Sequence, residues 1–100
     1  MQELIDKVQE LVAFELERAN TIHPPKFNSM HEAYAVMLEE LDEAKEELDE
    51  LQRLMVDLWE LVKADCDEET LERLHGVECR AVKAVAEVIQ CAAMARKARM

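Results

Sequence analysis

The sequence predicts a single all-α domain over residues 1–100, in which a shorter helix precedes a hairpin of two long antiparallel helices. One glycine and two prolines among 100 residues leave too few turn residues for a hairpin-rich β fold. Apolar residues recur at helical spacing in three segments, which cover residues 2–19, 30–64 and 68–98. Half of the residues are apolar, which is enough for the core of one domain.

The first predicted helix covers residues 2–19 and is amphipathic. Its apolar side chains lie three or four residues apart, at Leu4, Ile5, Val8, Leu11, Val12, Leu16 and Ala19. We expect it to end near Asn20, because Pro24 and Pro25 cannot continue a helix. The sequence leaves open whether this helix packs on its own hairpin or crosses to a neighbouring subunit.

The second predicted helix covers residues 30–64 and begins with a capping box. Ser29 and Glu32 are three residues apart, so the hydroxyl and the carboxylate can each accept a hydrogen bond from a free backbone donor. Apolar residues then alternate in steps of three and four over four heptads: Tyr34, Met37, Leu41, Ala44, Leu48, Leu51, Met55, Leu58 and Val62. This unbroken seam predicts one helix about 50 Å long.

The third predicted helix covers residues 68–98. The chain breaks before it at residues 65–67, and we expect an acidic cap ahead of Glu68 and Glu69. Basic residues near its end, from Arg96 to Arg99, suit the negative end of the helix dipole. Gly76 either kinks this helix or splits it into a short turn and a main helix, and the sequence does not decide between a broken and a continuous helix.

The long seam of the second helix also predicts assembly. One short helix of the same chain cannot cover a rod of this length, so we expect a long antiparallel partner, a second subunit, or both. The predicted assembly is a homodimer or homotetramer built as a four-helix-type bundle.

Charge and composition exclude several classes of partner. The formal net charge of -11 disfavours binding to nucleic acid or to anionic membranes, because both carry negative phosphates. The longest apolar run, residues 33–38, is far too short to span a membrane, and the acidic start does not resemble a signal peptide. Three cysteines without framework spacing predict reduced thiols, and hence a cytoplasmic protein.

An acidic segment interrupts an otherwise apolar row of the second helix. Eight of the twelve residues from 39 to 50 are acidic, which usually marks a solvated face. However, the row that contains Glu40, Glu43 and Glu47 is apolar at both ends, from Val36 at one end to Leu51 and beyond. This pattern favours a packed face that opens into a carboxylate patch, where a divalent cation would offset the repulsion.

A narrow polar line crosses the apolar third helix at the same height. Lys83, Glu87 and Gln90 follow one another in steps of four and three. If the chain reverses near residue 66, residue n faces about position 132 minus n, which places Glu43 level with Ile89 and Gln90 level with Asp42, so the two polar clusters meet at the same height. An intrahelical Lys83–Glu87 ion pair on a solvent-exposed stripe is the structural alternative.

Two segments carry a resemblance to a known family. The stretches HEAYAVMLEELDEA (residues 31–44) and EVIQCAAMA (residues 87–95) resemble the MazG-like all-α nucleoside triphosphate pyrophosphohydrolases, especially their short phage-type members. The family pattern is E-x-x-E on one helix and E-x-x-D on the next. Glu40 and Glu43 match the first motif, Glu87 matches the first acid of the second, and Gln90 stands where an aspartate is expected.

The resemblance implies a hydrolase that cleaves a nucleoside triphosphate to the monophosphate and pyrophosphate with Mg²⁺ or Mn²⁺. Glu40, Glu43 and Glu87 would be the catalytic metal ligands, and Gln90 a neutral ligand or a hydrogen-bond donor. Lys83 and Gln90 would contact the substrate, and the residues held in reserve for positioning the metal or the water are Glu39 and Glu47.

Other hypotheses remain at this point. A helical interaction or structural module of the same fold, without catalysis, would explain the seam and the missing fourth acid. A third hypothesis is a protein that binds nucleotide or metal without turnover. A zinc site at His75, Cys79 and Cys66 lacks a fourth ligand and fits no standard spacing.

Overall fold

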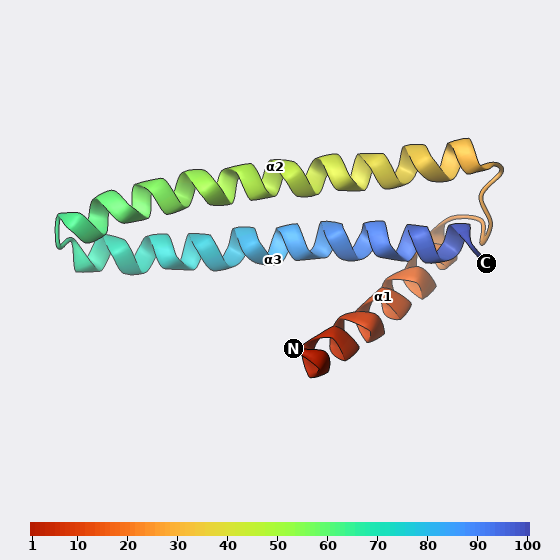
Figure 1. Cartoon of the computed structure of the whole chain (residues 1–100), viewed down its shortest axis with the longest axis horizontal. Helices are drawn as coiled ribbons and strands as arrows, with labels where there is room; N and C mark the ends of the chain where they lie inside the picture. Colours follow the sequence, from red (N-terminus) through yellow and green to blue (C-terminus); the bar gives the residue numbers. More distant parts are fainter.

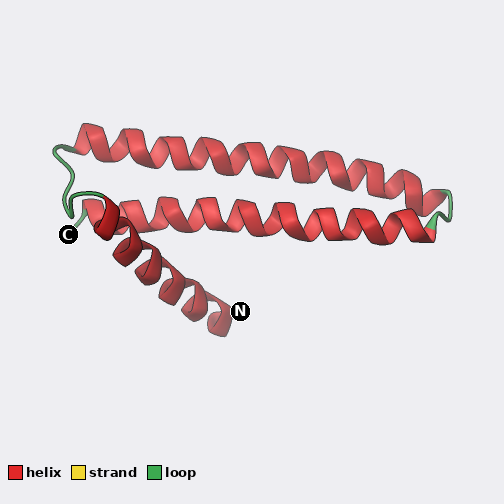
Figure 2. Ribbon diagram, turned by 180° about the vertical axis from the view of Figure 1, so that it is seen from behind, coloured by secondary structure: helices red, strands yellow, loops and turns green.

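The computed structural model describes all 100 residues. They form three helices, α1 (Gln2–Ile22), α2 (Met30–Lys63) and α3 (Asp67–Ala98), joined by two short connecting segments. Figures 1 and 2 show that α2 and α3 lie side by side and antiparallel along the whole molecule, while α1 crosses beside the C-terminal end of α3. The predicted all-α hairpin with an N-terminal helix is therefore confirmed. The first helix packs on α3 of its own chain.

The helix bounds differ from the predicted ones by three residues or fewer. The end of α1 is shifted most, because the helix continues through Thr21 and Ile22 and stops just before the two prolines. The start of α3 lies at Asp67, one residue earlier than predicted. Cys66 occupies the N-cap without a side-chain hydrogen bond, so the expected acidic cap is wrong: the acids 67–69 lie inside the first turn. There they face the positive end of the helix dipole.

Half of the predicted capping box forms at the start of α2. The Glu32 backbone N–H donates to Ser29 Oγ at 3.1 Å, as predicted. The Glu32 carboxylate reaches one residue further back than a standard capping box, and accepts from the backbone and side-chain nitrogens of Asn28 at 3.2 and 2.9 Å. The entry to α2 is therefore held by three hydrogen bonds.

Two backbone hydrogen bonds end α2 and form the turn that leads into α3. The backbone N–H of Cys66 donates to the Leu61 carbonyl and that of Asp65 donates to the Val62 carbonyl, each at 3.1 Å. This is the Schellman arrangement, which requires a left-handed residue between the two helices. Asp65 supplies it with φ 55°, a conformation that aspartate adopts more readily than most residues.

Gly76 neither kinks nor splits α3, which runs unbroken from Asp67 to Ala98. A Cβ at this position would lie 3.7 Å from Leu54 Cδ1, an ordinary contact distance. The glycine therefore serves neither a turn nor a close helix approach. The hairpin rule places position 78 opposite Leu54, so this contact lies about half a helical turn from the predicted level.

The buried core of one chain is small. It is centred where α1 meets α3 and consists of Val12, Leu16, Ala19, Ala93 and Met94, with Phe27 and Val36 packed against it. Every seventh residue of the predicted seam is 45–64% exposed on the outer side of α2: Tyr34, Leu41, Leu48, Met55 and Val62. We call these five residues the outer stripe. None of the three helices combines the length and the apolar character that a membrane span requires.

Candidate metal centre

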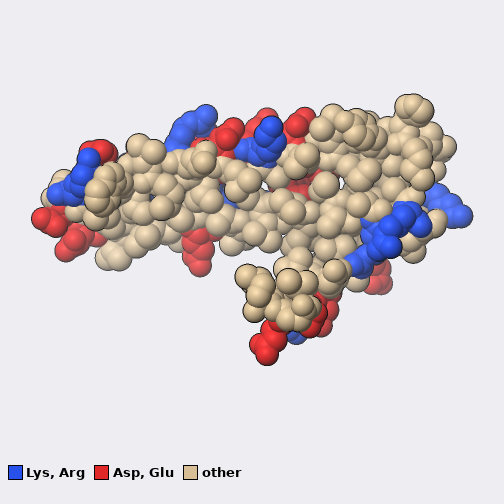
Figure 3. All heavy atoms as spheres, viewed as in Figure 1, with Lys and Arg blue, Asp and Glu red and all other residues tan.

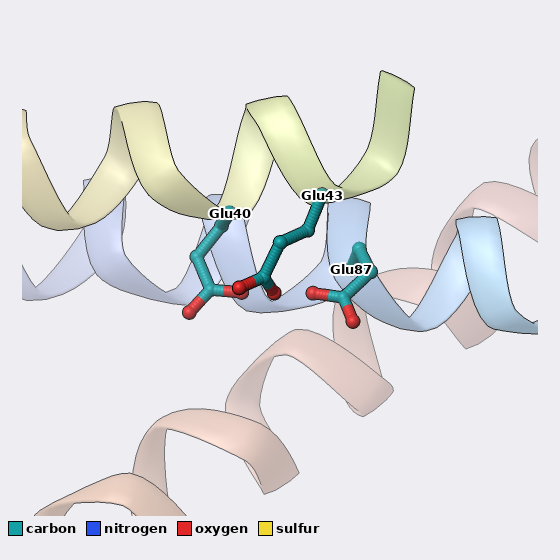
Figure 4. A group of neighbouring side chains, drawn as sticks. All are labelled: Glu40, Glu43 and Glu87. Atoms are coloured by element: carbon teal, nitrogen blue, oxygen red, sulfur yellow. The ribbon is translucent and has the colours of Figure 1, made fainter. Parts of the chain in front are cut away.

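Three carboxylates from two helices converge on one point. Glu40 and Glu43 extend from α2 toward α3, where they meet Glu87, as Figure 4 shows. One oxygen from each residue lies within 4.8 Å of the other two. No other group of three or more His, Cys, Asp and Glu side chains in the molecule brings its ligand atoms together in this way.

Helical spacing and small neighbours place these carboxylates. Glu40 and Glu43 are three residues apart, so they project from the same face of α2. Ala44 on α2 and Ala84 on α3 are 1% and 4% exposed, and such small side chains at the contact let the two helices approach closely. The interrupted apolar row of the sequence therefore does face α3, as its pattern predicted.

Gln90 joins the cluster as a hydrogen-bond donor. Its amide nitrogen faces the carboxylates and donates to Glu40 Oε2 at 2.8 Å and to Glu87 Oε2 at 2.9 Å. Because carboxylates only accept, this is the orientation of the amide that satisfies both partners. The neutral side chain thus bridges α2 and α3 at the position where the resemblance expects an aspartate.

All three carboxylic acids hold their protons more tightly than usual. Burial raises the pKa of Glu40, and burial together with the hydrogen bond that protonated Glu87 donates to Glu40 raises the pKa of Glu87. The pKa of Glu43 is raised mainly by its hydrogen bond and its repulsion with Glu87. Repulsion between the carboxylates adds to these causes at all three residues, and a divalent cation is one way to compensate it.

The structure adds a residue that the sequence analysis missed. Glu15 on α1 lies close enough to Glu40 for their carboxylates to repel each other, and the Glu15 side chain is only 13% exposed. Arg18 holds it in a two-pronged ion pair of 2.6 and 2.8 Å, which lowers the pKa of Glu15. The sequence did contain a signal for this residue. Glu15 interrupts the apolar row of Val12 and Ala19 on the first helix, in the same way as Glu40 interrupts an apolar row of the second helix.

The remaining predicted residues lie outside the cluster. Glu47, one of the two reserve residues, forms an ion pair with Arg80 of α3 at 3.1 Å. It therefore connects the two helices and does not join the carboxylate cluster. Lys83 is exposed and takes part in none of the six ion pairs, so the structural alternative, a Lys83–Glu87 pair, does not form. Glu39 is also exposed and acts on Glu40 and Glu43 only through its charge.

Only two of the three residues in the zinc hypothesis, His75 and Cys79, lie next to each other. Cys79 Sγ lies 3.6 Å from His75 Nε2, one helical turn away on α3. The Cys66 thiol instead points to the Ala64 carbonyl at 3.8 Å, and no third metal ligand joins the pair. All three cysteines are free thiols.

Comparison with known proteins adds no family. No protein-family model, no curated protein and no solved structure matches the chain. The molecule is thus an all-α three-helix protein with an acidic cluster, and its function has to be argued from that cluster.

Proposed function

We propose that this protein is a Mg²⁺-dependent nucleoside triphosphate pyrophosphohydrolase of the MazG-like kind, or a weakly active relative. The observation that supports the proposal is the convergence of Glu40, Glu43 and Glu87 across two helices, within 4.8 Å. The proposal joins this convergence to the motif resemblance of residues 31–44 and 87–95. Hard oxygen ligands of this type suit Mg²⁺ and Mn²⁺.

In this proposal Glu40, Glu43 and Glu87 would hold the cation, which would supply charge neutralisation for the triphosphate and polarisation for the attacking water. Water adds to the α-phosphorus, the bond from that phosphorus to the bridging oxygen breaks, and pyrophosphate leaves. The water proton passes to a carboxylate or to solvent.

Gln90 and Lys83 have different parts in the proposal. Gln90 holds Glu40 and Glu87 in place through its amide nitrogen. If the amide group rotates by 180°, its oxygen would instead face the cluster as a neutral metal ligand. Lys83 lies one helical turn from Glu87 on α3 and contacts the triphosphate. Glu39 is the remaining reserve residue for positioning water.

The test is release of pyrophosphate from a panel of nucleoside and deoxynucleoside triphosphates with Mg²⁺ or Mn²⁺. We expect metal-dependent release that falls at least tenfold in Glu40→Gln and Glu87→Gln. Asp42→Asn is the matched control, because it removes one exposed negative charge from the same helix outside the cluster. Absence of release from every triphosphate at any metal concentration would refute the enzymatic proposal.

A second candidate is a helical interaction module without catalysis, and the outer stripe favours it. Five large apolar residues at heptad spacing are exposed, whereas charged residues usually cover such a surface. We propose in either case that a second copy covers this stripe in a homodimer or homotetramer, in the reducing environment that three free thiols suit. Light scattering tests the assembly: Leu48→Glu should give a monomer, whereas a monomeric parent protein would contradict it.

A further inference from the structure

One lysine of α3 is buried without an ionic partner. Lys97 is 7% exposed, the only charged residue among the nine buried ones. It takes part in none of the ion pairs or side-chain hydrogen bonds, and its ammonium lies 4.6 Å from the centre of the Phe27 ring. Lysine is almost never this buried unless it is paired, because removing an ammonium from water is costly.

The Lys97 side chain lines two adjoining cavities of about 280 and 270 Å³. Both cavities are also lined by Lys26 and Phe27, from the segment between α1 and α2. Two lysines therefore line the same space beside an aromatic ring. The volume is near the lower end for ligand sites, which fits a small ion or one chemical group rather than a large ligand.

The charge balance of the larger cavity is positive. Its one acidic lining residue is Glu32, whose carboxylate already accepts two hydrogen bonds from Asn28. Lys26 and Lys97 oppose it in a chain whose formal net charge is -11. Figure 3 shows basic side chains near the C-terminal end of α3, and also along α2 and at the far end of the hairpin, where acidic side chains lie beside them. A positive cavity in so acidic a protein would concentrate anions locally.

We propose that this cavity binds an oxyanion of the phosphate class, held by Lys97 and Lys26 against the Phe27 ring. Two lysines that line one cavity match the double charge of a phosphate better than the single charge of a carboxylate. The cavity reaches Val36, about 6 Å along α2 from Glu40, so it is a site of opposite charge separate from the carboxylate cluster. The inference requires neither metal binding nor catalysis.

The experiment follows thermal stability during a titration with inorganic phosphate. EDTA is present throughout, so the carboxylate cluster holds no divalent cation, and sodium chloride keeps the ionic strength constant. Phosphate should raise the melting temperature of the parent protein by mass action. Lys97→Met keeps the length of the side chain but removes its charge, and it should weaken the apparent phosphate affinity at least tenfold.

Lys45→Met is the matched control, because Lys45 is an exposed lysine of α2 that forms no ion pair and lines neither cavity. It should respond to phosphate like the parent protein, which separates specific binding from the general stabilising effect of phosphate salts. Lys26→Met should also weaken the response, at least threefold. This second variant keeps the test decisive if Lys97→Met fails to fold, because Lys26 is exposed and outside the helices.

A nucleoside monophosphate titrated in parallel identifies the source of the group. Stabilisation at tenfold lower concentrations of the monophosphate, lost in Lys97→Met, would assign the cavity to a phosphate group carried on a nucleotide. Equal or stronger stabilisation by inorganic phosphate would assign it to the free ion. The proposal is overturned if phosphate leaves the parent protein unchanged, or if it stabilises Lys97→Met and the parent equally.

Discussion

The amide nitrogen of Gln90 on α3 lies 2.8 Å from Glu40 Oε2 on α2, and the same nitrogen lies 2.9 Å from Glu87 Oε2. One neutral side chain therefore connects two carboxylates that belong to different helices. Each hydrogen bond has an acceptor that can carry charge, which makes it stronger than a neutral one. This bridge keeps two of the three candidate metal ligands close together in spite of their repulsion.

Replacing Gln90 with aspartate should exchange stability for metal affinity. The variant Gln90→Asp loses both donated hydrogen bonds and adds a fourth negative charge, so we expect the metal-free protein to lose about 1–2 kcal/mol. The additional carboxylate should strengthen stabilisation by Mg²⁺ and increase pyrophosphate release. Urea unfolding with and without Mg²⁺ checks the first two effects. Gln52→Asp, at an exposed position of α2, controls for the change of residue type.

The raised pKa values predict a dependence of stability on pH with a definite sign. A carboxyl group whose pKa is higher in the folded than in the unfolded protein binds protons more tightly when folded. Its contribution therefore favours folding at low pH and is lost as the pH rises from the ordinary value of 4.5 through the raised pKa. Glu15, whose pKa is lowered, contributes in the opposite direction.

Glu87→Gln isolates this contribution. The variant should be more stable than the parent protein at pH 8, by up to about 1 kcal/mol, because it relieves the repulsion in the cluster. The difference should shrink as the pH falls through the raised pKa, because the parent carboxyl group then binds its proton as well. Denaturant unfolding at several pH values measures it. An advantage that is equal at all pH values, or equal to that of Asp42→Asn, would contradict the assignment.

The Arg80–Glu47 pair should contribute modestly to the hairpin. Its atoms lie 3.1 Å apart, and the two side chains are 39% and 23% exposed, so solvent screens part of their attraction. We expect Arg80→Met to cost less than about 1 kcal/mol, with a coupling to Glu47→Gln of about 0.5 kcal/mol in a double-mutant cycle. A coupling near zero would show that the pair does not hold the two helices together.

Gly76→Ala should stabilise the protein by about 0.5–1 kcal/mol. Gly76 lies inside a continuous helix, and the added Cβ would make an ordinary contact with Leu54. Alanine loses less conformational freedom than glycine on folding, so the gain arises largely in the unfolded chain. Thermal unfolding monitored by circular dichroism checks it. A destabilised variant would show that the helices pack more closely at this point than the structure describes.

The fold could be predicted from the sequence because helical periodicity and capping signals are local. Ser29 marked the start of α2 correctly, and the seam from Tyr34 to Val62 correctly indicated one long helix. Gly76 was ambiguous, since packing along a long hairpin outweighs the weak helix propensity of one residue. The exact register was also out of reach, because it depends on the left-handed turn at Asp65.

The candidate site was predictable only in part. Glu40, Glu43 and Glu87 stood out because acids interrupt apolar rows of two helices that must face each other. Glu15 was missed, since nothing local shows how the first helix crosses α3. Lys97 was assigned only to the helix dipole, and its burial depends on the segment that carries Phe27. Contacts between distant segments therefore limit what the sequence alone can show.

Binding of Mn²⁺, followed by its electron paramagnetic resonance signal, tests most directly whether the three carboxylates form one cation site. The parent protein should bind one Mn²⁺ per chain at the cluster, in competition with Mg²⁺. Glu40→Gln and Glu87→Gln should each weaken the affinity at least tenfold, whereas Asp42→Asn should leave it unchanged. Equal Mn²⁺ affinity in all four proteins would show that Glu40, Glu43 and Glu87 are only a charged surface.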